Sequence, residues 1–261
     1  MSYEIGLITV LFFIGFFGSA ISGMVGIGGS IIKYPMLLYL PPLFGFTAYT
    51  AQEVSAISAI QVFFATLAAM FVFKKGGYIH KQLVIYMGGS IIIGSFIGAY
   101  GSKFLPNNII NLVYAILALT AAIMMLFPKK GDENGETTEV TFHKGLAIMS
   151  SGVIGIVAGI VGAAGAFITV PVMLVLLKIP TRVAIGSSLA ITFFSSIGST
   201  VGKLLGGHML LMPSVVMVIA SLIAAPLGAN VSKKINTKIL QNILLLLIIG
   251  TVVKIWTEIL F

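Results

Sequence analysis

Two stretches of similar sequence decide how this chain folds: residues 23–35, GMVGIGGSIIKYP, and residues 159–171, GIVGAAGAFITVP. Each stretch carries a glycine at every third position of its first half and ends in a proline. The matched positions, all shifted by 136 residues, are Gly23 with Gly159, Gly26 with Gly162, Gly29 with Gly165 and Pro35 with Pro171. Ordered matches of this kind indicate an internal repeat, so the chain is predicted to consist of two related halves.

The likeness continues on the C-terminal side of both stretches. Ala51 and Ser55 fall on Ala184 and Ser188, and the run Gly98, Ala99, Ser102 and Lys103 falls on Gly228, Ala229, Ser232 and Lys233. A charged segment rich in lysine and glutamate, residues 128–144, divides the chain almost in the middle. The predicted units are therefore half one at 1–127, a linker at 128–144 and half two at 145–261.

Composition places both halves in a membrane. The chain has 261 residues, of which 58% are hydrophobic and 8% charged, whereas soluble domains carry about 25% charged residues. Several uncharged runs reach the ~20 residues that a membrane-spanning helix needs. The sequence therefore predicts an all-α polytopic membrane protein. Its first apolar run, from Ile5, is expected to be structural rather than a cleaved signal, because no basic segment precedes it.

Each half is predicted to contain a glycine-broken helical hairpin followed by three transmembrane helices. The hairpins cover residues 5–46 and 145–180, and the second arm of each is too short to cross a bilayer comfortably. The expected spans are 51–73, 82–102 and 108–127 in half one, and 183–202, 210–232 and 238–258 in half two.

The lysines predict that the two halves are inverted with respect to one another. The lysine-rich connection follows the first span in half one, with Lys74, Lys75 and Lys81, but the second span in half two, with Lys233, Lys234 and Lys238. Because lysine-rich loops are cytoplasmic, this pattern predicts an inverted repeat, a cytoplasmic linker and both termini outside. The net charge of +8 is assigned to topology and to contact with membrane lipid, so no nucleic-acid partner is expected.

Few side chains in the apolar body can carry acid–base or metal chemistry. The chain has no cysteine, and six of its seven carboxylates lie at the termini or in the linker, which leaves Glu53. Catalytic pairs and metal sites need at least two convergent groups, so no catalytic residue, no metal and no cofactor is predicted, and the protein is not expected to be an enzyme. If transport is coupled to protons, Glu53 is the carboxylate available to carry one.

The glycine breaks are the candidate binding site. A broken helix exposes backbone amides that lipid cannot satisfy, and a helix that restarts after the break presents N–H groups and a positive dipole end, which favour an anion. The expected binding residues are Gly26, Gly28, Gly29 and Ser30 in half one and Gly162, Gly165 and Ala166 in half two, with Ser55, Ser188 and Thr192 as hydroxyl donors. Two inverted hairpins are expected to direct these ends towards one small anion near the midplane. The alternatives are that the glycines only allow close packing and that the hydroxyls bond their own helix.

These motifs resemble the TauE/SafE family of sulfite and organosulfur anion exporters. The likeness rests on the two hairpins, on the AxxxS pattern that follows each, and on the GA-x-x-SK stretch of each half, and it covers nearly the whole chain. The second hairpin departs from the family pattern by carrying Ala163 and Ala164 where a glycine could stand.

The resemblance implies an inner-membrane secondary transporter that exports a small sulfur-containing anion, such as sulfite, sulfoacetate or a related sulfonate, by alternating access. The competing interpretations are an anion channel and a subunit of a membrane-embedded enzyme. The sequence does not indicate an oligomeric state.

Overall fold

The computed structural model describes residues 2–26, 30–74, 77–126, 140–162 and 165–260, and all the regular structure in these ranges is helical. In the first half the helices are α1 (Ser2–Val25), α2 (Ser30–Leu43), α3 (Ala51–Lys74), α4 (Lys81–Gly101), the short η1 (Ser102–Phe104) and α5 (Asn107–Leu126). In the second half they are α6 (Lys144–Val161), α7 (Ala166–Pro171), the π-helical η2 (Val172–Leu176), α8 (Thr181–Gly206), α9 (Leu211–Ser232) and α10 (Thr237–Leu260). Residues 128–139 of the predicted linker lie outside the described residues.

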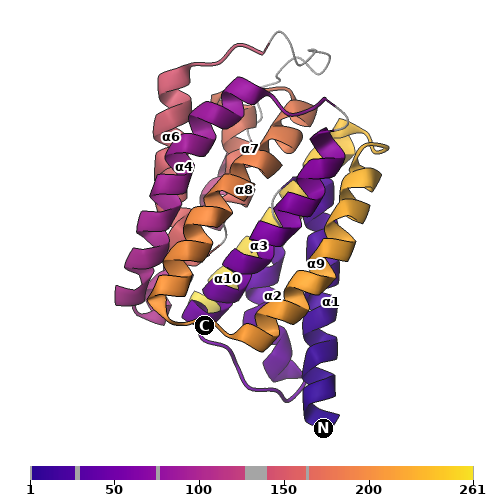
Figure 1. Ribbon diagram of the computed structural model, residues 1–261, viewed down its shortest axis with the longest axis vertical. Coiled ribbons are helices and arrows are strands. Elements are labelled where there is room, and N and C mark those ends of the chain that lie inside the picture. Colours follow the sequence, from indigo (N-terminus) through magenta and orange to yellow (C-terminus); the bar gives the residue numbers. More distant parts are fainter. Residues whose placement is uncertain (1, 27–29, 75–76, 127–139, 163–164, 261) are drawn as a thin grey trace.

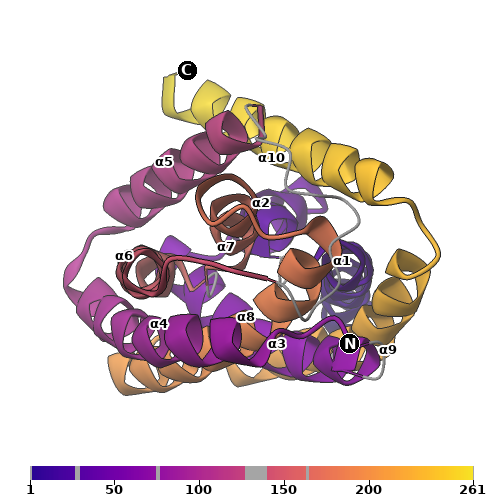
Figure 2. The same ribbon diagram turned by 90° about the horizontal axis from the view of Figure 1, so that it is seen from above.

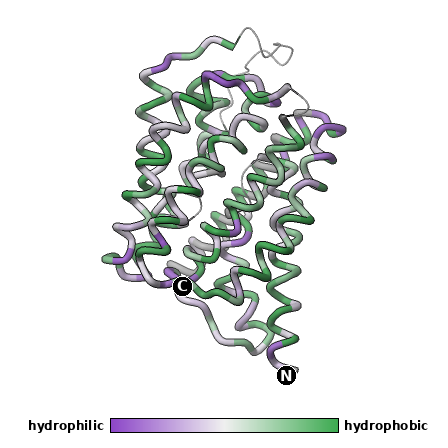
Figure 3. Tube along the Cα trace, in the orientation of Figure 1, coloured by the Kyte–Doolittle hydropathy of each residue, from purple (hydrophilic) through white to green (hydrophobic). Residues whose placement is uncertain are grey.

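The chain is a multi-pass membrane protein. Seven of the described helices, α1, α3, α4, α5, α6, α8 and α9, are long and apolar enough to cross a membrane. Hydrophilic residues gather towards the two ends of the bundle, while the helices between them are mostly apolar (Figure 3). The predicted spans match the helices, although α8 begins two residues before its predicted span and ends four residues after it.

The helices form three layers, and the two hairpins make the middle one. Viewed from above, α5 and α10 form one outer layer and α4, α8, α3 and α9 form the other, with α6, α7, α2 and α1 between them (Figure 2). The hairpin of half one is α1 with α2, and that of half two is α6 with α7 and η2. The described glycines of the two breaks, Gly26, Gly162 and Gly165, are buried, as backbone that leaves a helix inside a membrane must be.

Glycines fix each hairpin against the opposite half of the chain. A Cβ atom placed on Gly228 of α9 would lie 1.8 Å from the carbonyl oxygen of Ala20 in α1, and one on Gly98 of α4 would lie 1.9 Å from that of Ile156 in α6. Only glycine allows backbones to approach so closely, so Gly98 and Gly228 serve the packing of the outer helices on the hairpins. The first arm of each hairpin thus packs on a helix of the other half.

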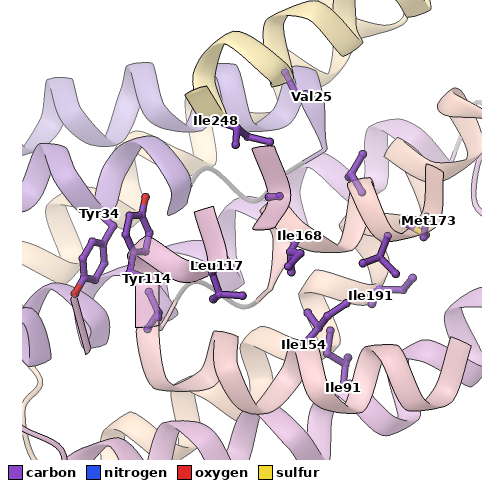
Figure 4. Close-up of a cluster of buried hydrophobic side chains, with 14 of the residues drawn as sticks. Val25, Tyr34, Ile91, Tyr114, Leu117, Ile154, Ile168, Met173, Ile191 and Ile248 are labelled. Atoms are coloured by element: carbon purple, nitrogen blue, oxygen red, sulfur yellow. The ribbon is translucent and has the colours of Figure 1, made fainter. Parts of the chain in front are cut away.

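A cluster of buried apolar side chains joins the layers (Figure 4). The rings of Tyr34 in α2 and Tyr114 in α5 stack at 4.4 Å between centroids, and the Tyr34 hydroxyl donates to Asn111 Oδ1 at 2.9 Å. Such a stack contributes about 0.5–1.5 kcal/mol beyond the area that it buries. It holds the second arm of the first hairpin against the outer layer.

The bundle has two chemically different ends. At the linker end, Phe142 packs on His80 before α4, Lys144 lies over the Tyr86 ring, and Arg182 donates to the Ile235 carbonyl. At the terminal end, where α1 begins, Gln52 donates to the Leu105 carbonyl. Figure 1 shows the N-terminus at the terminal end and α10 finishing towards that same end, while α6 begins at the linker end. Most of the basic residues in the connections, including Lys81, Lys144, Arg182, Lys233 and Lys234, belong to the linker end.

Candidate functional site

The first turn of the site, at Gly26, follows α1 and packs on α8. Gly26 has a φ of 78°, which favours glycine, and its carbonyl oxygen accepts a 2.7 Å hydrogen bond from Ser188 Oγ. A Cβ on Gly26 would lie 2.8 Å from the carbonyl oxygen of Ile185. Helix α2 restarts at Ser30, whereas the predicted site residues Gly28 and Gly29 lie outside the described residues.

The second turn, which begins at Gly162 and ends at Gly165, follows α6 and packs on α3. Gly162 has a φ of 72° and caps α6 by donating to the carbonyls of Ala158 and Gly159. A Cβ on Gly162 would lie 1.9 Å from the carbonyl oxygen of Ser55, and Ser55 Oγ donates to the Ile160 carbonyl at 3.1 Å.

Gly165, with a φ of 66°, then precedes α7, which begins at the predicted site residue Ala166. The structure thus brings Ser188 to the first turn and Ser55 to the second, as matching positions in the two halves would require.

The two turns lie far apart along the bundle. Helices α3 and α8 run antiparallel and cross where the rings of Phe63 and Phe193 stack at 5.2 Å. Ser55 precedes Phe63 by eight residues and Ser188 precedes Phe193 by five, so at ~1.5 Å per residue the turns are separated by ~20 Å. One small anion cannot contact both turns at once in this conformation.

This separation corrects the expectation of two helix ends that face one anion at the midplane. The first arms have 24 and 18 residues, or ~36 Å and ~27 Å of helix. Each therefore crosses most of the bilayer before it breaks. As a result α2 starts towards the linker end and α7 towards the terminal end, and their N-termini point to opposite faces of the membrane.

Buried side-chain oxygens without hydrogen-bond partners lie between the turns. Six such oxygens occur in the described part of the chain. One is Thr200 Oγ1, on a half-buried residue of α8, and the other five are Ser58 Oγ and Gln61 Oε1 on α3, and Thr192 Oγ1, Ser195 Oγ and Ser199 Oγ on α8. All five side chains are fully buried. Nearly all buried polar groups in proteins have partners, so a cluster of unsatisfied ones marks a place where water or a polar ligand belongs. Thr192 was predicted from the sequence as a donor, and its oxygen is one of the five.

Two lysines are buried in the same interior. Lys33 of α2 is fully buried, and its Nζ lies 3.4 Å from Ser19 Oγ. Ser19 Oγ also accepts from Gln61 Nε2 at 2.6 Å, and Gln61 Nε2 reaches Ser221 Oγ at the same distance. This cluster ties α1, α2, α3 and α9 together close to the level at which α3 and α8 cross.

Lys203 of α8 is 4% exposed. Its Nζ donates to Ser102 Oγ at 2.6 Å and to the Ile160 carbonyl at 2.9 Å. Sequence reasoning missed Lys203 because an apolar run is taken to end at a lysine, here after residue 202. The helix continues to Gly206 and turns the lysine inward.

Glu53 forms a capping box at the start of α3. Its Oε2 accepts from the backbone N–H and the hydroxyl of Thr50 at 2.8 and 2.9 Å, and its own N–H donates to Thr50 Oγ1 at 3.2 Å. This reciprocal pattern satisfies N–H groups that a helix start leaves open. Glu53 thus lies at the terminal end of the bundle, and its role in proton coupling stays a prediction.

Across the residues described, histidine, aspartate and glutamate side chains do not gather in groups of three or more that could hold a metal ion. The polar atoms that do gather are hydroxyls, an amide and two ammonium groups. Such groups bind oxygen-bearing ligands through donated hydrogen bonds.

Comparison with known proteins agrees with this membrane architecture. A family model described as sulfite exporter TauE/SafE matches residues 11–255. The probable membrane transporter proteins YunE and YdhB of Bacillus subtilis (strain 168) are 25% identical over 262 residues and 23% identical over 247 residues. These alignments cover 92% of this chain in both cases, and 94% and 95% of the relatives.

A probable membrane transporter protein of Haemophilus influenzae is 26% identical over 233 residues, which cover 88% of this chain and 87% of the relative. No solved structure gives a significant match.

Proposed function

This chain belongs to the sulfite exporter TauE/SafE family, and from that premise we propose that it is a secondary transporter that exports a small sulfur-containing anion. The cargo class comprises sulfite, sulfoacetate and related sulfonates, and the proposed mechanism is alternating access. The names of the relatives point to membrane transport rather than to an enzyme.

The observation that carries the proposal is the chemistry of the interior. Among the residues whose burial is described, the buried charged side chains are two lysines, Lys33 and Lys203. The groups around them are hydroxyls, the Gln61 amide and backbone carbonyls. An interior with a positive charge at each of two levels, and with hydrogen-bond donors between them, stabilises an anion and repels a cation.

An inverted repeat would give this interior its alternating access. Three observations support it. Helix α1 packs on α9 as α6 packs on α4, Gly26 of the first turn lies against Ser188 as Gly162 of the second lies against Ser55, and α1 and α6 begin at opposite ends of the bundle (Figure 1). Transporters built from inverted repeats expose their site to each face in turn by exchanging the conformations of the two halves. In this chain the two turns would be the anion's contacts at the two faces.

The orientation follows from charge. Basic residues are concentrated at the linker end, which we therefore assign to the cytoplasm, with both termini outside. The first turn would then receive the anion from the cytoplasm and the second turn would release it. The outward direction of transport rests on the family.

Flux measurements in proteoliposomes test the proposal. Purified protein should transport labelled sulfite or sulfoacetate with saturation and support counterflow, whereas sulfate measures discrimination by charge and size and mannitol serves as a neutral control. Preference for mannitol or for a cation over every anion would overturn the anion proposal. Flux that does not saturate and gives no counterflow would identify a channel instead of a carrier. Repeating the measurement with and without a pH gradient shows whether protons are coupled.

A further inference from the structure

One face of α8 carries a continuous line of polar side chains. Its members are spaced by four, three, four and four residues, so at ~100° per residue they lie within about 80° of one another around the helix axis. We call this line the α8 stripe; it consists of Ser188, Thr192, Ser195, Ser199 and Lys203. All five side chains are buried.

The α8 stripe points into the bundle and connects the two turns. The lipid-exposed residues of α8, among them Val201 and Leu204, lie on roughly the opposite side of the helix. The stripe begins at Ser188, which bonds the Gly26 carbonyl of the first turn. It ends at Lys203, which bonds the Ile160 carbonyl beside the second turn. A ligand that follows this face travels from one turn to the other.

The middle of the stripe is not satisfied by the helix itself. Several buried hydroxyls elsewhere in this protein bond a carbonyl of their own helix, as Thr66, Ser95 and Ser151 do at 2.6–2.7 Å. Thr192, Ser195 and Ser199 form no hydrogen bond within the described part of the chain. Leaving three hydroxyls unsatisfied in one line is costly, at ~1–3 kcal/mol for each group, unless a ligand or water pairs with them.

The repeat shows that packing does not require this polarity. The positions of α3 that match the stripe, at a shift of 133 residues, are Ser55, Ala59, Val62, Thr66 and Met70. Ala59 and Val62 are fully buried apolar side chains, and Thr66 bonds its own helix. Three of the five positions are therefore apolar in half one, so packing does not require a polar side chain at the corresponding places of the stripe.

Lys203 ends the stripe with a charge that has only neutral partners. Its hydrogen bonds go to a hydroxyl and a carbonyl, and within the described residues it forms no ion pair. The Ile160 carbonyl already accepts from Ser55, so it is shared between two donors. A buried ammonium group of this kind is stabilised most by an anion that replaces one of its neutral partners.

We propose that the α8 stripe is the path of the anion between the two turns and that Lys203 binds the anion at the second turn. The ligand class is a small oxyanion whose sulfur-bound oxygens accept from the hydroxyls and from the ammonium group. The inference rests on the proposed function and adds the residues that line the path.

Substitution of Lys203 tests the charge. Lys203→Gln should raise the sulfite concentration for half-maximal counterflow by roughly 10- to 100-fold, the loss expected for a charge-assisted hydrogen bond, while Lys203→Arg should stay close to wild type. The matched control is Lys103→Gln, which removes a lysine at the same end of the bundle that lies over the Tyr100 ring. Wild-type half-saturation in Lys203→Gln would overturn the role of Lys203.

A second pair of variants tests the path even if Lys203 variants fold poorly. Ser199→Ala removes an unpartnered hydroxyl, so it should leave the thermal midpoint of the sulfite-free protein unchanged or raise it, yet reduce sulfite flux at least about tenfold. Thr66→Ala, at the matching position of α3, should not reduce flux beyond its effect on folding. Ser199→Ala with wild-type flux would refute the path.

Wild-type protein provides the control for the underlying function. If it shows neither sulfite flux nor stabilisation by sulfite, the proposed function fails. If it shows both while Lys203→Gln and Ser199→Ala behave as wild type, the transporter stands and the α8 stripe alone is refuted.

Discussion

Replacing Gly162 by alanine measures how closely the second turn approaches α3. Gly162 has a φ of 72°, a conformation that costs an L residue about 1–2 kcal/mol. The new Cβ would lie 1.9 Å from the carbonyl oxygen and 2.6 Å from the carbonyl carbon of Ser55. Overpacking of this kind costs about 1–3 kcal/mol as the backbones separate. We therefore expect Gly162→Ala to lose about 2–5 kcal/mol of unfolding free energy.

The chain offers a matched control in Gly207. Its φ is 82°, but a Cβ placed there would have no neighbouring atom within 4 Å. Gly207→Ala should therefore lose only the backbone part, about 1–2 kcal/mol. Unfolding of purified protein by sodium dodecyl sulfate in mixed micelles measures both variants on one scale. The difference between them, about 1–3 kcal/mol, is the contribution of the contact with α3.

The same pair of variants separates packing from transport. If the second turn contacts the anion, Gly162→Ala should also reduce sulfite flux per folded molecule, because the displaced turn moves the Ile160 carbonyl that Ser55 and Lys203 share. Gly207→Ala should transport at the wild-type rate. Equal losses of unfolding free energy in the two variants would refute the close approach of Gly162 to α3. Equal sulfite flux per folded molecule would show that Gly162 serves packing alone.

Three further predictions concern charge, titration and orientation. Glu53→Gln should fold with a loss of at most ~1 kcal/mol, because glutamine also serves a capping box; loss of acceleration by a pH gradient would assign proton coupling to this carboxyl, and retained acceleration would remove that role. Burial lowers the pKa of His80 below its usual 6.5, and its neutral Nδ1 caps α4, so this stabilisation is present above pH 6.5 and is lost as pH falls through the lowered pKa. The thermal midpoint of wild type should fall more steeply below that pH than the midpoint of His80→Asn, and parallel curves would contradict this. Because the chain has no cysteine, Thr47→Cys should react with an impermeant maleimide on intact cells and Lys234→Cys only after permeabilisation, whereas the reverse pattern would invert the topology.

Hydropathy and the repeated glycines were sufficient to predict the helices and the hairpins. Local sequence fixes both features: apolar runs of about 20 residues form spans, and Gly26 and Gly162 adopt the positive φ that ends α1 and α6. Helix ends were less predictable at charged residues. The apolar run before Lys203 was predicted to end at this lysine. The helix in fact continues past Lys203 to Gly206, and the long lysine side chain turns into the bundle.

The sequence did not predict which helices pack on one another. Nothing in the pattern of Gly98 or Gly228 specifies that one packs on α6 and the other on α1, because small residues allow close approach by any partner helix. The depth of the turns depends on that pairing. Once α1 is packed along α9, its 24 residues bring Gly26 close to the linker end, and the two turns cannot meet.

In the proposed transporter, the difference between α3 and α8 makes the path asymmetric. Glycine contacts such as those of Gly98 and Gly228 occur in both halves because the same backbone approach must be made twice. A path for one ligand is needed once, so in the proposal its lysine and its line of hydroxyls belong to α8, while Ala59 and Val62 fill the matching face of α3. Positions that match between the halves therefore identify the scaffold. In the proposal, the buried polar positions that are apolar in the other half, namely Thr192, Ser195 and Lys203, line the path of the ligand.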